Sequence, residues 1–78
     1  MKLKIITPNG TSEHTAEAIF LPGEYGAFEV LKGHAPIIST LVAGDVRWRA
    51  ASSSEEERFA VSGGAVMVEN DVITVCAE

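Results

Sequence analysis

Turn-forming residues divide this chain into short apolar segments, and this feature constrains its fold most. The turn signals recur roughly every 8–12 residues, a spacing that is typical of a β-sandwich or barrel. No extended window places apolar side chains at i, i+3, i+4 and i+7, so no helix is predicted. The sequence therefore predicts an all-β domain. The turn signals are Pro8-Asn9-Gly10, Pro22-Gly23, Lys32-Gly33-His34-Ala35-Pro36, Gly44-Asp45, the polar loop over residues 52–57, Gly63-Gly64 and Asn70-Asp71.

The segments between these signals predict short strands. Residues 2–5 alternate between basic and apolar side chains, as in a strand with one buried face. Asn9-Gly10 and Asn70-Asp71 favour tight hairpins. Gly44-Asp45 is expected to form a tight turn, and Gly63-Gly64 is expected to separate two strands. The predicted strands cover residues 2–7, 13–21, 27–31, 37–43, 46–50, 58–62, 65–69 and 72–77.

The 78 residues are expected to form one domain, residues 1–78, with a thin margin of stability. A domain this short buries only about 60% of the surface that its unfolded chain exposes. Cys76 is the only cysteine, which excludes an internal disulfide. Together with His14 and His34 it is one ligand short of a four-ligand zinc site. Assembly with another protein is the remaining way to add stability.

The acidic composition argues against several classes of partner. Eleven acidic residues oppose six basic ones, which gives a formal net charge of -5. Binding to nucleic acid or to anionic lipid is driven by basic residues, so neither is predicted. No apolar run approaches the roughly 20 residues that span a bilayer, and the amino terminus does not resemble a signal peptide. The lone thiol suits a reducing compartment.

The sequence contains no recognisable catalytic or cofactor-binding motif. It has neither a P-loop nor a G-x-G-x-x-G fingerprint. Cys76 lies in an apolar segment and is expected to be a buried small hydrophobe. Glu55-Glu56-Glu57, in a polar loop over residues 52–57, is expected to be a solvated hairpin tip. We therefore predict no catalytic residue, no cofactor and no metal.

Most aromatic side chains lie at predicted strand positions, where core packing is the simplest expectation. It is favoured for Phe20 and Phe59, whereas the arginines beside Trp48 suggest partial exposure of that ring. His14 lies among polar residues and is expected to be solvated.

Residues 21–36 contain more glycine and proline than a plain hairpin needs. Glycine permits a positive φ or a close backbone approach, and Pro36 favours an extended conformation at Ala35. His34 lies at the end of this segment. It either hydrogen-bonds neighbouring backbone and fixes the turn, or contacts a partner on a shaped surface, and the two roles are compatible.

The motifs of this segment resemble the signature of the epsilon subunit of bacterial F-type ATP synthases, and two further blocks match in order and spacing. Together they extend over the whole chain. The matching blocks are Leu21-Pro22-Gly23, Gly26, Gly33-His34-Ala35-Pro36, Gly44-Asp45-Val46, Phe59-Ala60-Val61-Ser62-Gly63-Gly64 and Val72-Ile73-Thr74-Val75.

The resemblance implies a roughly ten-stranded β-sandwich or flattened barrel at the foot of the central stalk. Family members bind the gamma subunit, rest on the c-ring of a proton- or sodium-translocating enzyme and rotate with both, without an active site. The implied location is peripheral, at the cytoplasmic face of the bacterial inner membrane. The gamma contact is expected at His34, Ser39 and Met67. The c-ring contact is expected at Glu24, Tyr25, Gly26, Ala27, Phe28 and Glu29.

The chain departs from the family pattern at several positions. Ala27 stands where the family usually has glutamate, so Glu24 or Glu29 would have to supply the acidic c-ring contact. Met67 stands where glutamate is common, which replaces a charge by an adaptable apolar surface. The sequence ends at Glu78, before the two-helix C-terminal domain of most bacterial members, so the inhibitory arm is expected to be absent.

Two other functions are compatible with parts of the sequence. A free-standing small β-barrel binding module would need an apolar cavity, for which a barrel packed with Ile, Val and Phe has little room. A small hydrolase that uses His34 with an acidic residue would need a nucleophile, and the sequence places none beside it. The rotor subunit is therefore favoured.

Overall fold

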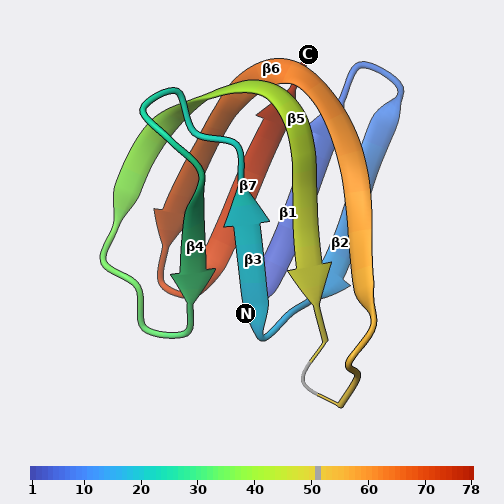
Figure 1. Cartoon of the computed structure of the whole chain (residues 1–78), viewed down its shortest axis with the longest axis vertical. Helices are drawn as coiled ribbons and strands as arrows, with labels where there is room; N and C mark the ends of the chain where they lie inside the picture. Colours follow the sequence, from blue (N-terminus) through green and yellow to red (C-terminus); the bar gives the residue numbers. More distant parts are fainter. Residues whose placement is uncertain (51) are drawn as a thin grey trace.

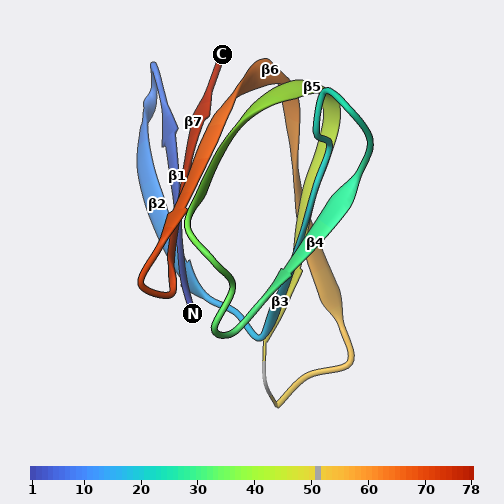
Figure 2. The ribbon, with the colours of Figure 1, turned by 90° about the vertical axis from the view of Figure 1, so that its left-hand side faces the viewer.

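In the described part of the chain, seven strands form one sheet that folds over itself into two layers (Figure 1, Figure 2). The computed structural model describes residues 1–50 and 52–78. In this part of the chain no helix is long and apolar enough to cross a membrane. The sheet order is β2-β1-β7-β6-β5-β3-β4, with β1 and β7 parallel and the other pairs antiparallel. The strands are β1 (Lys2–Thr7), β2 (Gly10–Thr15), β3 (Ala18–Leu21), β4 (Phe28–Leu31), β5 (Ile37–Arg49), β6 (Glu56–Glu69) and β7 (Val72–Ala77).

The prediction of an all-β sandwich is confirmed, but the expected count of roughly ten strands is wrong. Gly44-Asp45 lies inside β5 and Gly63-Gly64 lies inside β6, so two predicted pairs of strands are two long strands. Val42 pairs with Gly63 across the hairpin, and Gly44 pairs with Val61. Because the glycines of the two strands lie nearly opposite each other, both strands bend at the same place and keep their pairing. Figure 1 shows them arching together over the top of the molecule.

The bend divides the sheet into two layers, which Figure 2 shows edge-on. The first layer contains β2, β1, β7, residues 64–69 of β6 and residues 37–41 of β5. The second layer contains β4, β3 and the remaining halves of β5 and β6.

The predicted strand over residues 13–21 is two strands, because the chain changes layer within it. The Ala16 amide donates to the Met1 carbonyl oxygen at 2.9 Å, whereas the Glu17 amide donates to the Arg49 carbonyl oxygen at 2.8 Å. β2 therefore ends beside β1, and β3 begins beside β5. A local pattern cannot reveal this change of partner, since both segments are extended.

One apolar core lies between the layers. Trp48 is part of it and is only 4% exposed, so the expected partial exposure is wrong. Arg47 and Arg49 point to the outer side of the sheet, because neighbouring side chains alternate across a strand. The Trp48 ring stacks on His14, with 4.5 Å between ring centroids, and its Nε1 donates to Glu57 Oε2 at 3.0 Å. The core residues are Leu3, Ile5, Ala16, Ile19, Leu21, Val30, Leu41, Val46, Trp48, Val61, Val66, Val68, Ile73 and Val75.

Three other expectations about burial are also wrong. Cys76 is exposed, because side chains alternate along β7: Ile73 and Val75 point into the core, so Cys76 points outward. Phe59 is 38% exposed and lines a surface hollow beside the β1–β2 hairpin. Phe20 is half-buried on the outer side of the second layer, where Arg47 covers its ring.

The predicted hairpin turns are confirmed in two places. Asn70 and Asp71 have φ angles of 52° and 59°, as a two-residue type I′ turn requires. The first hairpin turns at Pro8-Asn9, one residue earlier than expected, and Gly10 already pairs with Thr7. Residues 55–57 are exposed, as expected, but β6 begins at Glu56, and Glu56 forms an ion pair with Arg47 while Glu57 accepts a hydrogen bond from Trp48.

We predict that Gly64→Ala destabilises the domain far more than Gly26→Ala. Both glycines have a positive φ that strains any other residue, 138° at Gly64 and 128° at Gly26. A Cβ at position 64 would collide with the Cys76 carbonyl oxygen on β7, whereas position 26 faces open space. We expect a loss of about 3 kcal/mol or more against about 1 kcal/mol, measured by urea unfolding. Equal losses would show that β6 and β7 are not packed too closely for a side chain here.

Candidate protein-binding surfaces

The His34 turn connects β4 to β5 and is held by short hydrogen bonds. The His34 amide donates to the Leu31 carbonyl oxygen at 3.1 Å. The His34 ring nitrogen Nδ1 lies 2.7 Å from the Ala35 carbonyl oxygen, which is the backbone-fixing role expected for this histidine. Gly33 has a φ of 81° and its amide donates to Asp71 Oδ1 at 2.8 Å. The turn is therefore ordered from both sides, by its own residues and by the β6–β7 hairpin.

Part of the outer side of the first layer is apolar, and we call this part the apolar face. We define it by Ile38, Met67, Val72 and Cys76, all of which are exposed. Ile38 and Met67 are paired across β5 and β6 and are 80% and 44% exposed. Large apolar side chains left in water on one sheet face are typical of a surface that another protein covers.

A shallow groove of about 330 Å³ runs along this apolar face. It extends from the end of the His34 turn to the end of β6, so the turn forms one of its walls. The groove is lined by Pro36, Ile37, Ile38, Met67, Val68 and Glu69.

The three residues expected to contact a gamma subunit do not all lie on this face. Met67 belongs to it, and His34 is half-buried in the adjacent turn. Ser39 pairs with Val66, whose side chain is in the core, so Ser39 lies on the opposite side of the sheet from Met67. Sequence reasoning missed Ile38, the most exposed residue of the apolar face. The signal in the sequence was the alternation of side chains along the strand. If Leu41 faces the core, Ile38, three positions earlier, must face outward.

The second candidate surface is the loop between β3 and β4, together with the start of β4. The loop carries Glu24, Tyr25, Gly26 and Ala27 of the six residues expected to contact a c-ring, and Phe28 and Glu29 begin β4. β5 holds this loop through backbone hydrogen bonds of 2.9 Å, from Val42 to Pro22 and from Glu24 to Thr40. Tyr25 is 97% exposed at the tip of the loop. A rigid loop thus presents an aromatic side chain to solvent. Of the other expected residues, Glu24, Gly26, Ala27 and Glu29 are exposed, and Phe28 is half-buried against the core.

The His34 turn and the β3–β4 loop lie at different ends of the molecule. Figure 1 shows the β3–β4 loop at the top and the β4–β5 turn at the bottom, with β4 between them. The turn and the loop are therefore presented at separate places on the molecule.

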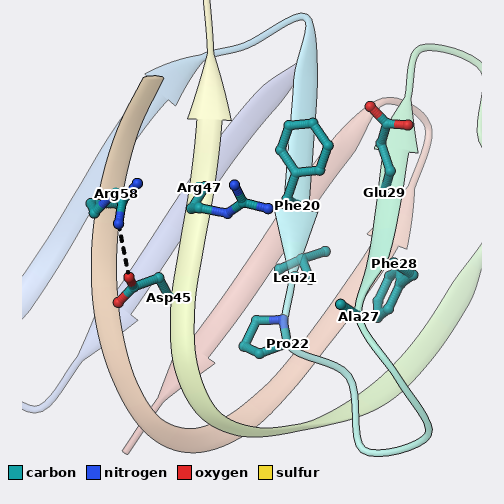
Figure 3. A pocket seen from close by; sticks show the side chains of 9 residues that line it. All are labelled: Phe20, Leu21, Pro22, Ala27, Phe28, Glu29, Asp45, Arg47 and Arg58. Atoms are coloured by element: carbon teal, nitrogen blue, oxygen red, sulfur yellow. Dashed lines mark hydrogen bonds and ion pairs between the residues drawn. The ribbon is translucent and has the colours of Figure 1, made fainter. Parts of the chain in front are cut away.

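The outer side of the second layer has a different, charged character (Figure 3). The Arg47 guanidinium lies 4.8 Å from the centroid of the Phe20 ring, and Arg47 also pairs with Glu56 at 2.9 Å. Arg58 Nη1 lies 3.4 Å from Asp45 Oδ2. These groups border an open groove of about 520 Å³, lined by Phe20, Leu21, Pro22, Ala27, Phe28, Glu29, Asp45, Arg47 and Arg58.

The titratable side chains do not form a catalytic arrangement in the part of the chain that the structure describes. The His14 ring stacks on Trp48 and its Nε2 lies 3.2 Å from Ser12 Oγ, while His34 is bonded to its own turn. No three metal-ligating side chains among residues 1–50 and 52–78 lie close enough to hold an ion.

Comparison with known proteins gives matches over the whole chain. Residues 1–78 match the family model described as "ATP synthase, Delta/Epsilon chain, beta-sandwich domain". The ATP synthase epsilon chain of Janthinobacterium sp. (strain Marseille) is 40% identical over 63 residues, which are 81% of this chain and 45% of that relative. The epsilon chain of Desulfitobacterium hafniense (strain DSM 10664 / DCB-2) is 34% identical over 77 residues, 97% of this chain and 57% of that relative. The chain spans about half the length of these relatives.

Solved structures with the same fold come from two mitochondrial ATP synthases. A chain of the central stalk and c-ring structure from Tetrahymena thermophila superposes with a TM-score of 0.83 at 16% identity, covering 99% of this chain and 62% of that one. A chain of the Euglena gracilis structure of OSCP, F1 and c-ring gives 0.86 at 19% identity, covering 96% and 48%. At these identities the likeness shows the fold alone. The family model, the relatives and the motifs agree, and the chain belongs to the delta/epsilon β-sandwich family of ATP synthases, as its resemblance to epsilon subunits implied.

Proposed function

We propose that this chain is a non-catalytic rotor domain that links the gamma subunit to the c-ring of an F-type ATP synthase. Its family membership and the names of its relatives support this role. The observation that carries the proposal is the apolar face, which a small domain exposes beside an ordered turn. In this proposal the complex holds the domain at the cytoplasmic face of the bacterial inner membrane. The coupling ion is either the proton or sodium.

The apolar face is proposed to bind gamma. Ile38 and Met67 together offer an aliphatic and a thioether side chain around a groove, which suits close packing against apolar side chains of a partner. Obligate interfaces resemble a domain core cut in half, and they are held mainly by such apolar contacts. His34 would border this interface, and Ser39 would support it from the inner side of β5.

The β3–β4 loop is proposed to face the c-ring. Tyr25 supplies a large, rigid contact area at low entropic cost, because the backbone bonds to β5 already hold the loop. Glu24 and Glu29 add negative charge on either side, which would attract basic polar loops of the ring. Ala27 supplies no charge, so the acidic contact of the family would shift to these neighbours.

A free-standing ligand-binding barrel is supported less well. Fourteen buried apolar residues form a single cluster between the layers, and the grooves beside Arg47 and beside Met67 are both open to the surface. A ligand-binding barrel instead encloses its ligand in the interior.

We predict that Ile38→Asp weakens gamma binding at least about 100-fold, since it places a charge in an apolar interface, at a cost of about 3 kcal/mol. The matched control is Leu31→Asp, because Leu31 is also exposed, at 50%, but lies on the outer side of the second layer. Both variants should keep their unfolding free energy within about 0.5 kcal/mol. Titration calorimetry with purified gamma measures the effect. Equal loss in both variants, or loss of wild-type binding in about 0.5 M salt, would contradict an apolar gamma interface on this face.

Cys76 provides an independent footprint of the same surface. Because its thiol is exposed on the apolar face, a thiol reagent should modify it in the folded protein without denaturant. Gamma should slow this modification at least about tenfold if it covers the face, a difference of about 1.4 kcal/mol. A Cys76→Ser, Ser54→Cys variant is the control, since Ser54 is exposed in the β5–β6 connection. If gamma slows thiol modification at position 54 but not at position 76, gamma does not cover the apolar face.

We predict that Tyr25→Ser and Glu29→Lys each reduce binding to the c-ring and leave gamma binding intact. The tyrosine change removes contact area and should raise the dissociation rate. The charge reversal should mainly lower the association rate, as changes of rim charges do. Glu55→Lys is the control, because it makes the same charge change in the β5–β6 connection. Association of the preformed gamma complex with detergent-solubilised c-ring is measured by surface plasmon resonance. If Tyr25→Ser abolishes gamma binding instead, the two surfaces are assigned the wrong way round.

A further inference from the structure

The Asp71 carboxylate joins two turns that are far apart in the sequence. Its Oδ1 accepts a hydrogen bond of 2.8 Å from the Gly33 amide, across 38 residues. Asp71 belongs to the β6–β7 turn, and Gly33 to the turn that carries His34. We call this bond the Asp71 tether. A bond from a backbone amide to a carboxylate is charge-assisted and stronger than one between neutral groups.

The β6–β7 turn does not need an aspartate at this position. Asn70 and Asp71 both have positive φ, and for such a turn Asn-Gly is the most favoured sequence. The part of Asp71 that supports the fold is its backbone carbonyl oxygen, which accepts the Lys2 amide at 3.0 Å. Glycine would provide the same carbonyl and adopt the same φ with less strain. The carboxylate therefore has a role outside its own hairpin.

The tether fixes the wall of the groove on the apolar face. Gly33 has a φ of 81°, and the other bonds of the turn, at His34, are local to it. The turn continues through Pro36 into β5, and Pro36 lines the groove opposite the end of β6. A turn tied to the β6–β7 hairpin holds these two sides of the groove in one arrangement before a partner arrives. Such preorganisation lowers the entropy lost on binding.

We infer that Asp71 is a positioning residue for the gamma interface, which keeps the His34 turn and Pro36 in place through its bond to Gly33. This inference rests on the proposed function, since it assumes that gamma occupies the apolar face. Asp71 itself lies at the end of the groove and is assigned no direct contact with gamma.

The test compares Asp71→Gly with Asp71→Asn in the full chain. Asp71→Gly removes the carboxylate and creates the favoured Asn-Gly turn, so the melting temperature should stay level or rise. The Gly33 amide should exchange with solvent at least about tenfold faster, and gamma should bind about five- to tenfold more weakly. Asp71→Asn keeps the acceptor oxygen and tolerates positive φ, so it should restore Gly33 protection and most of the affinity.

The outcomes separate the tether from the interface itself. Faster Gly33 exchange with unchanged gamma affinity would overturn the positioning role, provided that Ile38→Asp still abolishes binding. Unchanged Gly33 exchange in Asp71→Gly would overturn the tether directly. If Ile38→Asp also leaves gamma binding unchanged, the proposed interface fails, and faster Gly33 exchange would then show a tether that serves some other purpose than gamma binding.

Discussion

The β5–β6 hairpin is paired from Ile37 opposite Val68 to Arg49 opposite Glu56, and all other strands are attached to it directly or through one or two intervening strands. The hairpin reaches from one layer into the other, so the position of its bend decides which strand segments belong to each layer. The bend depends on glycines in both strands, and at Gly64 the β7 backbone approaches too closely for any side chain. Backbone geometry at this point therefore decides which side chains meet in the core.

The two outer sides of the sandwich differ in chemistry because the alternation of side chains differs between the halves of the long strands. In β5, Ile38 faces outward in the first layer, whereas Arg47 and Arg49 face outward in the second. Ion pairs with β6 satisfy the charged side, as in the contact of Arg47 with Glu56. Nothing in the described chain covers Ile38 in a comparable way. One side is thus suited to water and the other to a partner.

The sequence was sufficient to predict the all-β class, because alternation and turn residues are local signals. It was insufficient for the number of strands, since Gly63-Gly64 is compatible with a turn or with a bend, and only the partner strand decides between them. A shift of one residue moves a side chain to the other face, which is why Ser39 was grouped with Met67 and why Cys76 was expected in the core.

Long-range contacts gave no sequence signal either. The bond between Gly33 and Asp71 spans 38 residues, and neither residue type indicates the other. The His34 turn and the β3–β4 loop were found from their glycine and proline content, but their placement at different ends of the molecule follows from the path of β4.

The continuity of β5 and β6 through the bend also has a mechanical meaning. In a sandwich made of two separate sheets, a sideways load on one sheet is resisted only by side chains sliding over each other. Here two hydrogen-bonded backbones cross from layer to layer, so the same load must also change the φ and ψ angles of both paired strands and strain the hydrogen bonds between them. If one partner held the domain on its first layer and another held its β3–β4 loop, the domain would transmit torque between them with little internal deformation.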